Sequence, residues 1–197
     1  MNTTHTFVFF GIVGSGKGTQ VELLQKYLKE KNISDDVLFT STGNEYRKII
    51  ESGSYTGLIV KETLEKGYLQ PNFLTTSLFT NILINNMKEG TTFIADGYPR
   101  TISQSESFES AMKFYKRNIV HVIYIELGKE EATKRMKLRA RADDTDEGIA
   151  KRFDEYVNNV IPSMNYFKDK EGYIMHTING EQTIEQVHLD IIKSLGL

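Results

Sequence analysis

A glycine-rich segment near the N-terminus, GIVGSGKGTQ (residues 11–20), has the composition of a loop that binds phosphate. Glycines allow a backbone to turn so that successive N–H groups converge on an anion, and we expect this of Gly11, Gly14, Gly16 and Gly18. Lys17 can reach the outer phosphates of a nucleotide, and Ser15 and Thr19 offer hydroxyls. The general pattern G-x-x-x-x-G-K-[ST] places a hydroxyl directly after the lysine, whereas here Gly18 intervenes.

A second segment, ADGYPRT (residues 95–101), combines an acid, a turn and an arginine. Asp96 ends an apolar run, a common position for contact with the water shell of Mg²⁺. Gly97 and Pro99 shape a turn that presents Arg100, whose guanidinium can bind phosphate with two parallel hydrogen bonds. Alone the segment could be a surface turn, but after a strand and beside a phosphate loop we favour the functional interpretation.

Two further groups of residues are weaker signals. In TSTGNEYR (residues 40–47), Thr42 offers a hydroxyl, Gly43 leaves space beside it and Arg47 lies one helical turn on. Taken alone, that segment is better explained by a capped helix with a solvated arginine. The other group holds arginines with interleaved acids, Arg135, Arg139, Arg141 and Arg152 with Asp143 and Asp144. An anion could lie between Arg135 and Arg139, four residues apart on one helix face, but for the cluster alone we favour an ion-paired surface.

Five short β-rich runs must position these groups. Apolar patterns predict strands over residues 6–10, 37–40, 91–95, 119–127 and 173–178, with helical periodicity between them. The run at 119–127 is almost continuously apolar, which is typical of a strand buried on both faces. The last helix should begin after Thr183, with Gln186 as its reciprocal capping partner. Alternating strands and helices predict a parallel α/β sheet.

Two long insertions interrupt the alternation, at residues 41–90 and 129–170. Both follow the carboxyl end of a strand, the edge that carries ligands in α/β folds, so we expect both to serve substrates. The glycine loop, the Asp96 turn and Thr42 should meet at that same edge.

The composition excludes several classes of protein. The chain has 197 residues, a formal net charge of −2 and no cysteine. Bulk charge therefore indicates neither a nucleic-acid nor a membrane partner, and disulfides and cysteine-based zinc sites are ruled out. We see no signal peptide and no apolar run of about 18 residues that could span a membrane, so we expect a cytoplasmic protein of one domain.

Taken together, the four motifs closely resemble those of the adenylate kinase family of nucleoside monophosphate kinases, from Phe7 to the end of the chain. In that family the loop reads G-x-P-G-S-G-K-G-T-Q, so glycine after the lysine is normal. DGYPRT is similar to its D-G-[FY]-P-R-T, STGNEYR to its S-T-G-[DE]-x-x-R, and RARADD with Arg152 to its G-R-x-D-D and following arginine.

The resemblance implies a P-loop NTPase fold, with a five-stranded parallel sheet flanked by helices. It implies a nucleoside-monophosphate-binding lobe at residues 41–70 and a very short lid at 139–144. The core would comprise residues 1–40, 71–138 and 145–197. It also implies Mg²⁺ with ATP, held through water near Asp96 and Thr19, no zinc, and a monomer that binds ATP, AMP and ADP.

The resemblance further implies roles for individual residues. Phosphoryl transfer would depend on Lys17, Arg47, Arg100, Arg139, Arg141 and Arg152. ATP would contact Gly14, Ser15, Gly16, Lys17, Gly18, Thr19, Arg135 (stacked on the base), Arg139, Gly180 and Gln182. AMP would contact Thr42, Gly43, Arg47, Tyr68, Leu69, Gln70, Gly97, Tyr98, Pro99, Arg100, Gln104, Arg141 and Arg152.

Threonine at position 42 and glutamine at 104 favour AMP, because pyrimidine-specific relatives usually carry alanine and asparagines there. A kinase for UMP, CMP or another monophosphate, and a non-catalytic nucleotide sensor, are the alternatives. Three departures stand out. Val13 replaces the usual proline, Glu45 adds a negative charge near the acceptor, and only Ala140 separates Arg139 from Arg141. So short a lid would screen the phosphates less well from water.

Overall fold

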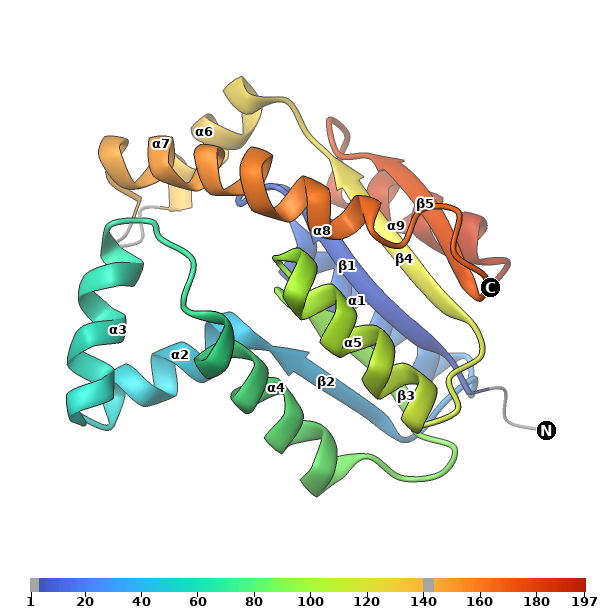
Figure 1. The fold of residues 1–197 in the computed structure, drawn as a ribbon. Helices are drawn as coiled ribbons and strands as arrows, with labels where there is room; N and C mark the ends of the chain where they lie inside the picture. Colours follow the sequence, from blue (N-terminus) through green and yellow to red (C-terminus); the bar gives the residue numbers. More distant parts are fainter. Residues whose placement is uncertain (1–3, 140–143) are drawn as a thin grey trace.

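The computed structural model describes residues 4–139 and 144–197, and its strands form one parallel sheet (Figure 1). The sheet has five strands in the order β2-β3-β1-β4-β5. Their bounds are β1 Thr6–Gly11, β2 Val37–Ser41, β3 Thr92–Asp96, β4 Val120–Glu126 and β5 Tyr173–Asn179. Each lies within one residue of its predicted limits at either end, and the predicted α/β fold is confirmed.

The register brings the chemically interesting strand ends to one edge. Asp96 at the end of β3 is the partner of Ser41 at the end of β2, and it also pairs with Phe9 of β1. Gly11, which ends β1, pairs with Ile125 of β4. The glycine loop, the Asp96 turn and the segment after Ser41 therefore leave the sheet side by side.

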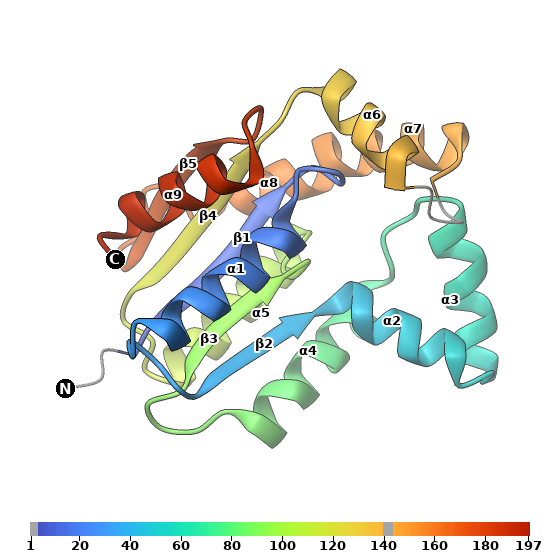
Figure 2. The same cartoon turned by 180° about the vertical axis from the view of Figure 1, so that it is seen from behind.

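Helices cover both faces of the sheet (Figures 1 and 2). One face carries α1 (Lys17–Glu30) and α9 (Ile184–Leu195). The other carries α4 (Asn72–Asn86), α5 (Ile102–Phe114) and the short α8 (Ile161–Asn165). Among the helices that the structure describes, none has the length and apolar character needed to cross a lipid bilayer.

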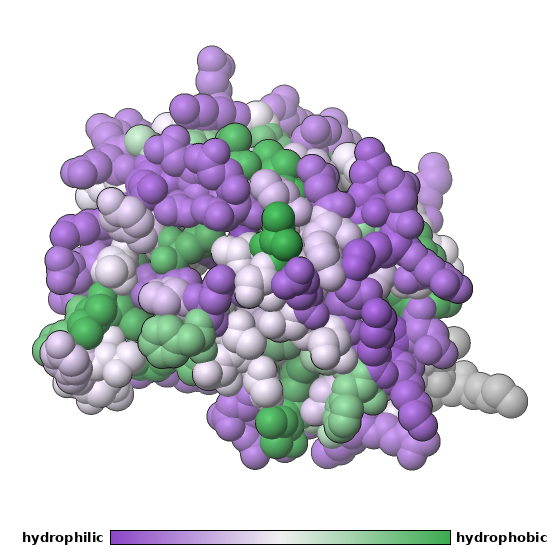
Figure 3. All heavy atoms as spheres, in the orientation of Figure 1, coloured by the Kyte–Doolittle hydropathy of each residue, from purple (hydrophilic) through white to green (hydrophobic). Residues whose placement is uncertain are grey.

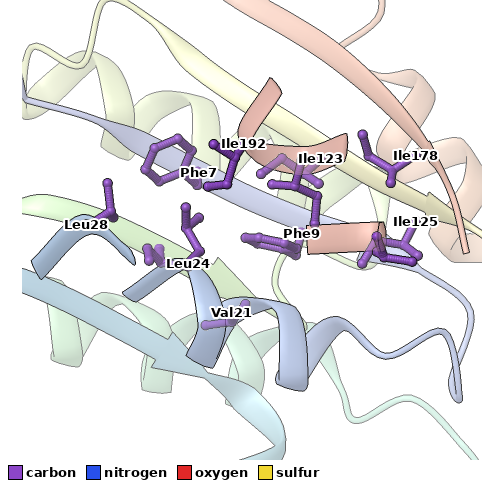
Figure 4. Close-up of a cluster of buried hydrophobic side chains, with 12 residues drawn as sticks. Phe7, Phe9, Val21, Leu24, Leu28, Ile123, Ile125, Ile178 and Ile192 are labelled. Carbon is purple, nitrogen blue, oxygen red and sulfur yellow. The ribbon is translucent and has the colours of Figure 1, made fainter. Parts of the chain in front are cut away.

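Each face has its own apolar core. Beneath α1 and α9, side chains from β1, β4 and β5 meet Val21, Leu24 and Leu28 of α1, whose spacing puts them on one helix face (Figure 4). On the opposite face, Phe79 and Phe108 pack with side chains of β1, β3 and β4. Burying one such side chain contributes about 1.5–3 kcal/mol, so the sheet is a firm support for the loops at its edge.

Four helices lie beyond that edge. They are α2 (Thr42–Glu51), α3 (Tyr55–Glu65), α6 (Lys129–Arg139) and α7 (Asp146–Glu155), the last continuing into a π-helical turn, Tyr156–Val160. In both ribbon views α3 and α7 lie on the same side of the sheet (Figures 1 and 2). The domain limits 41–70 and 139–144 stay predictions.

The segment after α3 touches α7 directly. A Cβ added at Gly67 would lie 2.4 Å from the carbonyl oxygen of Gly148, so the two backbones meet without side chains between them. Beside this contact, the Lys151 ammonium lies 4.6 Å from the ring centroid of Tyr68, a cation–π arrangement. The insertion after β2 and the insertion after β4 therefore close against each other over the sheet edge.

The outer surface differs between these insertions. Over α6 and α7 the visible surface is mostly hydrophilic, whereas hydrophobic side chains gather over α3 and α4 (Figure 3). These two helices carry the strongly exposed apolar or aromatic residues Tyr55, Leu58, Phe73 and Ile84.

Two local expectations were wrong. Gly18 does not help the loop to turn, because it lies in the first turn of α1 with ordinary helical geometry, whereas Gly11, Gly14 and Gly16 have positive φ. At α9, Thr183 accepts a hydrogen bond from the Gln186 N–H at 3.2 Å as predicted. The Gln186 side chain, however, donates to Asp190 at 2.9 Å instead of reaching back, so only half of the capping box forms.

Candidate active site

The glycine loop wraps the N-terminus of α1. Gly16 caps the helix with φ of 89°, and the Ser15 N–H donates to the carbonyl oxygen of Ile12 at 3.1 Å, which tightens the loop. Ser15 is buried, whereas Gly16, Gly18 and Thr19 are exposed. The unpaired N–H groups of the first helical turn and the positive end of the helix dipole thus face solvent, an arrangement suited to an anion.

Lys17 is held at the centre of this loop. Its ammonium donates to the carbonyl oxygens of Gly11 at 2.7 Å and Ile12 at 2.9 Å. Burial lowers the pKa of Lys17 to about 8; Asp96 opposes this shift, while Arg100 and Arg139 add to it. An incoming phosphate would replace carbonyl dipoles with full negative charge and restore the ordinary pKa.

Two cavities adjoin at the sheet edge. The loop cavity is lined by the glycine loop together with Thr19, Asp96, Arg47, Arg100, Arg135 and Arg139. The adjoining cavity, here called the inner cavity, is lined by predicted acceptor residues: Thr42, Gly43, Arg47, Tyr68, Leu69, Gln70, Gly97, Arg100, Gln104 and Arg152. Arg47, Arg100 and Arg139 belong to both linings, so charges on ligands in the two cavities would meet at these arginines.

Buried polar side chains form the wall of the inner cavity. The Thr42 hydroxyl donates to the carbonyl oxygen of Gly97 at 2.8 Å, and the Tyr46 hydroxyl pairs with that of Thr75. Gly97 has φ of +81°, and a Cβ there would lie 2.6 Å from the Thr42 hydroxyl. Only glycine therefore allows the Asp96 turn to approach Thr42 so closely.

The turn after Asp96 divides its side chains between core and cavity. Tyr98 is buried and stacks on Phe79 with ring centroids 4.0 Å apart, so its side chain belongs to the core. Any contact of Tyr98 with a ligand would come from its backbone. Pro99 lies beside Arg100 in a neighbouring part of the cleft, lined also by Lys17 and Arg152.

An acid organises the arginines of the second insertion. Asp144 accepts two hydrogen bonds from Arg139, both at 2.8 Å, and one from Arg152 at 2.8 Å. The Asp144 side chain is only 1% exposed, so it joins the end of α6 to α7 through a nearly dry, charge-assisted contact. Arg141 and Asp143 lie outside the described residues.

At the outer end of the loop cavity, Arg135 is fixed from two sides. Its guanidinium donates to Glu131 at 2.8 Å and to the carbonyl oxygen of Gly180 at 3.0 Å. Gln182 directs its side-chain amide to Asn179 and Asp190, so a contact with a nucleotide base would be through its backbone. The structure thus brings Arg135 and Gly180 together, and their contacts with the ATP base stay predictions.

A magnesium ion with nucleotide phosphates fits the residues present. Asp96 and Thr19 both line the loop cavity beside Lys17. The residues that the structure describes contain no cluster of three or more His, Asp or Glu side chains that could hold a metal by themselves. Mg²⁺ keeps several waters and needs only one or two protein oxygens beside phosphate, which is what this edge offers.

Comparison with known proteins agrees with this geometry. The family model described as adenylate kinase matches residues 9–172. The chain belongs to the adenylate kinase family.

Curated relatives named adenylate kinase match nearly the whole chain. One from Prochlorococcus marinus (strain AS9601) is 33% identical over 189 residues, covering 96% of this chain and 97% of the relative. One from Mycobacterium tuberculosis (strain ATCC 25618 / H37Rv) is 32% identical over 189 residues, covering 96% and 98%. One from Geobacillus sp. (strain WCH70) is 30% identical over 221 residues, covering 96% and 97%.

In this adenylate kinase family member, two side chains near the candidate site make contacts that the sequence did not predict. Asp144 was read only as one of several acids near the arginines, although it contacts two of them. Asn72 was not considered at all, yet it contacts Gln104 in the wall of the inner cavity. For Asp144 the position directly after the arginine-rich segment was an available signal, whereas for Asn72 there was none, because its partner lies 32 residues away.

Proposed function

We propose that this protein is an adenylate kinase that transfers a phosphoryl group reversibly from Mg-ATP to AMP and so produces two ADP. Family membership supports the activity. The observation that carries the assignment of the site is the convergence of Lys17 with Arg47, Arg100 and Arg139 between a phosphate-binding loop and a second, adjoining cavity. Two polyanions can come together only where positive charge offsets their repulsion.

The reaction needs little covalent chemistry from the protein. An AMP phosphate oxygen, already ionised at neutral pH, attacks the γ-phosphorus of ATP. The bond from that phosphorus to the bridging β–γ oxygen breaks, and ADP leaves with the electron pair. No general base is required, so catalysis consists of alignment and stabilisation of charge.

The chain's residues would divide this work. In our proposal Gly14 to Thr19 bind the β- and γ-phosphates, and Lys17 follows the charge that develops between them. Arg47 and Arg100 hold the AMP phosphate, while Arg139, Arg152 and Arg141 contact the group in transfer. Closure of the two insertions over the edge would exclude water, which would otherwise accept the phosphoryl group.

Mg²⁺ would be held through water near Asp96 and Thr19, and would offset negative charge on the nucleotide phosphates. We propose that Arg135 lies against the ATP base, with backbone atoms of Gly180 and Gln182 beside it. We further propose that the protein works as a cytoplasmic monomer.

The acceptor is tested by coupled assay of ADP formation with AMP, UMP, CMP and dAMP, each with Mg-ATP. We expect AMP to have the highest kcat/KM. A higher value with UMP or CMP would make the protein a pyrimidine monophosphate kinase, and no turnover with any of them would leave a nucleotide-binding sensor.

The short lid predicts a second measurable property. Because only Ala140 separates Arg139 from Arg141, we propose that water reaches the phosphates more readily than in relatives with a longer lid. ATP hydrolysis without AMP should therefore be faster than in such a relative assayed beside it. An equal or lower rate would refute this proposal.

A further inference from the structure

Gln104 is held at both ends of its amide, although it lies in the wall of a cavity. Gln104 is the third residue of α5 and is 1% exposed. The Arg100 N–H donates to Oε1 of Gln104 at 2.8 Å. Nε2 of Gln104 donates to Oδ1 of Asn72, the first residue of α4, at 2.9 Å.

The direction of these bonds decides which way the amide faces. A backbone N–H can only donate, so the Gln104 atom that faces Arg100 must be the oxygen. Nε2 then points to Asn72, which must offer its own oxygen in return. A flipped Gln104 would place a donor against the Arg100 N–H and an acceptor against Oδ1 of Asn72, and would lose both bonds.

Thr101 closes the arrangement into a ring. Its hydroxyl accepts from the Gln104 N–H at 3.2 Å as the cap of α5, so its hydrogen is directed elsewhere. The Thr101 hydroxyl donates this hydrogen to Oδ1 of Asn72, with 3.0 Å between the two oxygens. The Asn72 oxygen thus receives two hydrogen bonds, and both report the same orientation of the Asn72 amide.

We propose that Asn72 is a positioning residue that fixes the orientation of the Gln104 amide and thereby makes the inner cavity prefer bases that carry an amino group beside an unprotonated ring nitrogen. The inference rests on the proposed function, because it assumes that the inner cavity receives a nucleoside monophosphate. It adds a residue and a physical basis for selection among bases.

The chemistry of the bases gives the reason. After its bonds to Arg100 and Asn72, the Gln104 amide keeps one lone pair on Oε1 and one hydrogen on Nε2. Adenine offers an amino hydrogen beside the ring acceptor N1, which matches this pair. Hypoxanthine has the same shape but offers a carbonyl oxygen beside an N–H. Its oxygen would face Oε1 of Gln104, and its N–H would face the hydrogen on Nε2.

IMP is therefore the sharpest probe, because it differs from AMP only at this edge. In Asn72→Leu the amide loses one of its two fixed bonds, and we expect the ratio of kcat/KM for AMP over IMP to fall about three- to tenfold. The change should come from KM, with kcat at saturating AMP retained. Asn72→Asp keeps an acceptor oxygen and should keep the wild-type ratio.

A matched control is available on the same helix. Asn86 is exposed on α4, and its amide donates only within the helix, to the carbonyl oxygen of Ile82 at 2.8 Å. Asn86→Leu should leave the AMP to IMP ratio unchanged. Asn72 is itself exposed, so Asn72→Leu should fold, which thermal unfolding of each variant will verify.

Two results would overturn the inference: an unchanged ratio in Asn72→Leu, whether or not both activities fall, or a ratio that Asn72→Asp does not keep. The proposed function fails separately, if the wild type forms no ADP from AMP. In that event equilibrium binding of AMP and IMP to the same variants still tests the amide, and equal affinity of the wild type for both would refute its selectivity.

Discussion

The loop cavity and the inner cavity share three arginines but differ in the rest of their linings. In the loop cavity the glycine loop presents its backbone, with exposed Gly16, Gly18 and Thr19 around one tethered lysine, and charged side chains complete the lining. The inner cavity is formed by side chains such as Thr42, Tyr46 and Gln104, which are at most 5% exposed and hydrogen-bonded to neighbours.

The difference follows from what each cavity would recognise. Phosphate oxygens are alike in all nucleotides, so converging N–H groups suffice and the loop can stay open to solvent. A base is recognised by a particular edge of donors and acceptors, which requires side chains that are fixed before the ligand arrives. Substitutions in the two regions should therefore change different kinetic constants.

The largest expected effect is at Lys17. Lys17→Met removes the charge that follows the transferred phosphoryl group, and we expect kcat to fall about 10²- to 10³-fold. Lys26→Met, at a lysine of the same helix whose side chain is 69% exposed, is the control and should retain activity. A comparable loss in both variants would show that the effect is not specific to the loop.

Asp144 contacts two arginines that line the cavities. Replacing Asp144 should therefore affect turnover rather than the binding of one nucleotide alone. Asp144→Asn would release Arg139 and Arg152 from their common partner, and displaced arginines can cost up to about 10²-fold in kcat. Steady-state kinetics at saturating ATP and AMP measures this. Asp154→Asn, at an exposed acid of α7, should have little effect. Wild-type kcat in Asp144→Asn would contradict the positioning role.

The KM for ATP should depend on pH, because Lys17 loses its charge at moderately alkaline pH. The pKa of Lys17 is lowered to about 8 from its ordinary 10.5, chiefly by burial. Only the ammonium form attracts phosphate, and its fraction in the free protein falls as the pH rises through about 8. We expect KM for ATP to rise above that pH by up to about tenfold per pH unit.

Lys17→Arg offers the matched comparison, because a guanidinium stays protonated across this range. Its KM for ATP, whatever its absolute value, should vary less between pH 8 and about pH 9.5 than that of the wild type. An identical pH profile in the two proteins would assign the titration to another group.

The smallest expected effect is on the KM for AMP alone, after a substitution in the wall of the inner cavity. Thr42→Val keeps the shape of the side chain but leaves the carbonyl oxygen of Gly97 without its partner. We expect KM for AMP to rise about three- to tenfold while KM for ATP stays constant. Thr80→Val, on the exposed side of α4, is the control. A parallel rise in both KM values would mean that the cavities are not independent.

The sequence predicted the elements well because their signals are local. Apolar runs located the strands, and glycines with a lysine located the loop, since both patterns lie within about ten residues. The hydrogen bonds of Asn72 and the burial of Tyr98 depend on partners far along the chain. Gly18 was misread for a related reason. Whether a glycine bends the backbone or lies in a regular helix depends on its surroundings, and Gly18 lies in α1 with open space where a Cβ would be.

The contact between Gly67 and Gly148 has a consequence for how far the cleft at the sheet edge can close. Because no side chain separates the two backbones, the insertions reach the shortest distance that peptide groups allow. Alanine at position 67 would hold them apart and would also strain a backbone with φ of +80°. The pair of glycines thus permits the close approach of the two insertions, so a side chain at position 67 would keep the sheet edge more open.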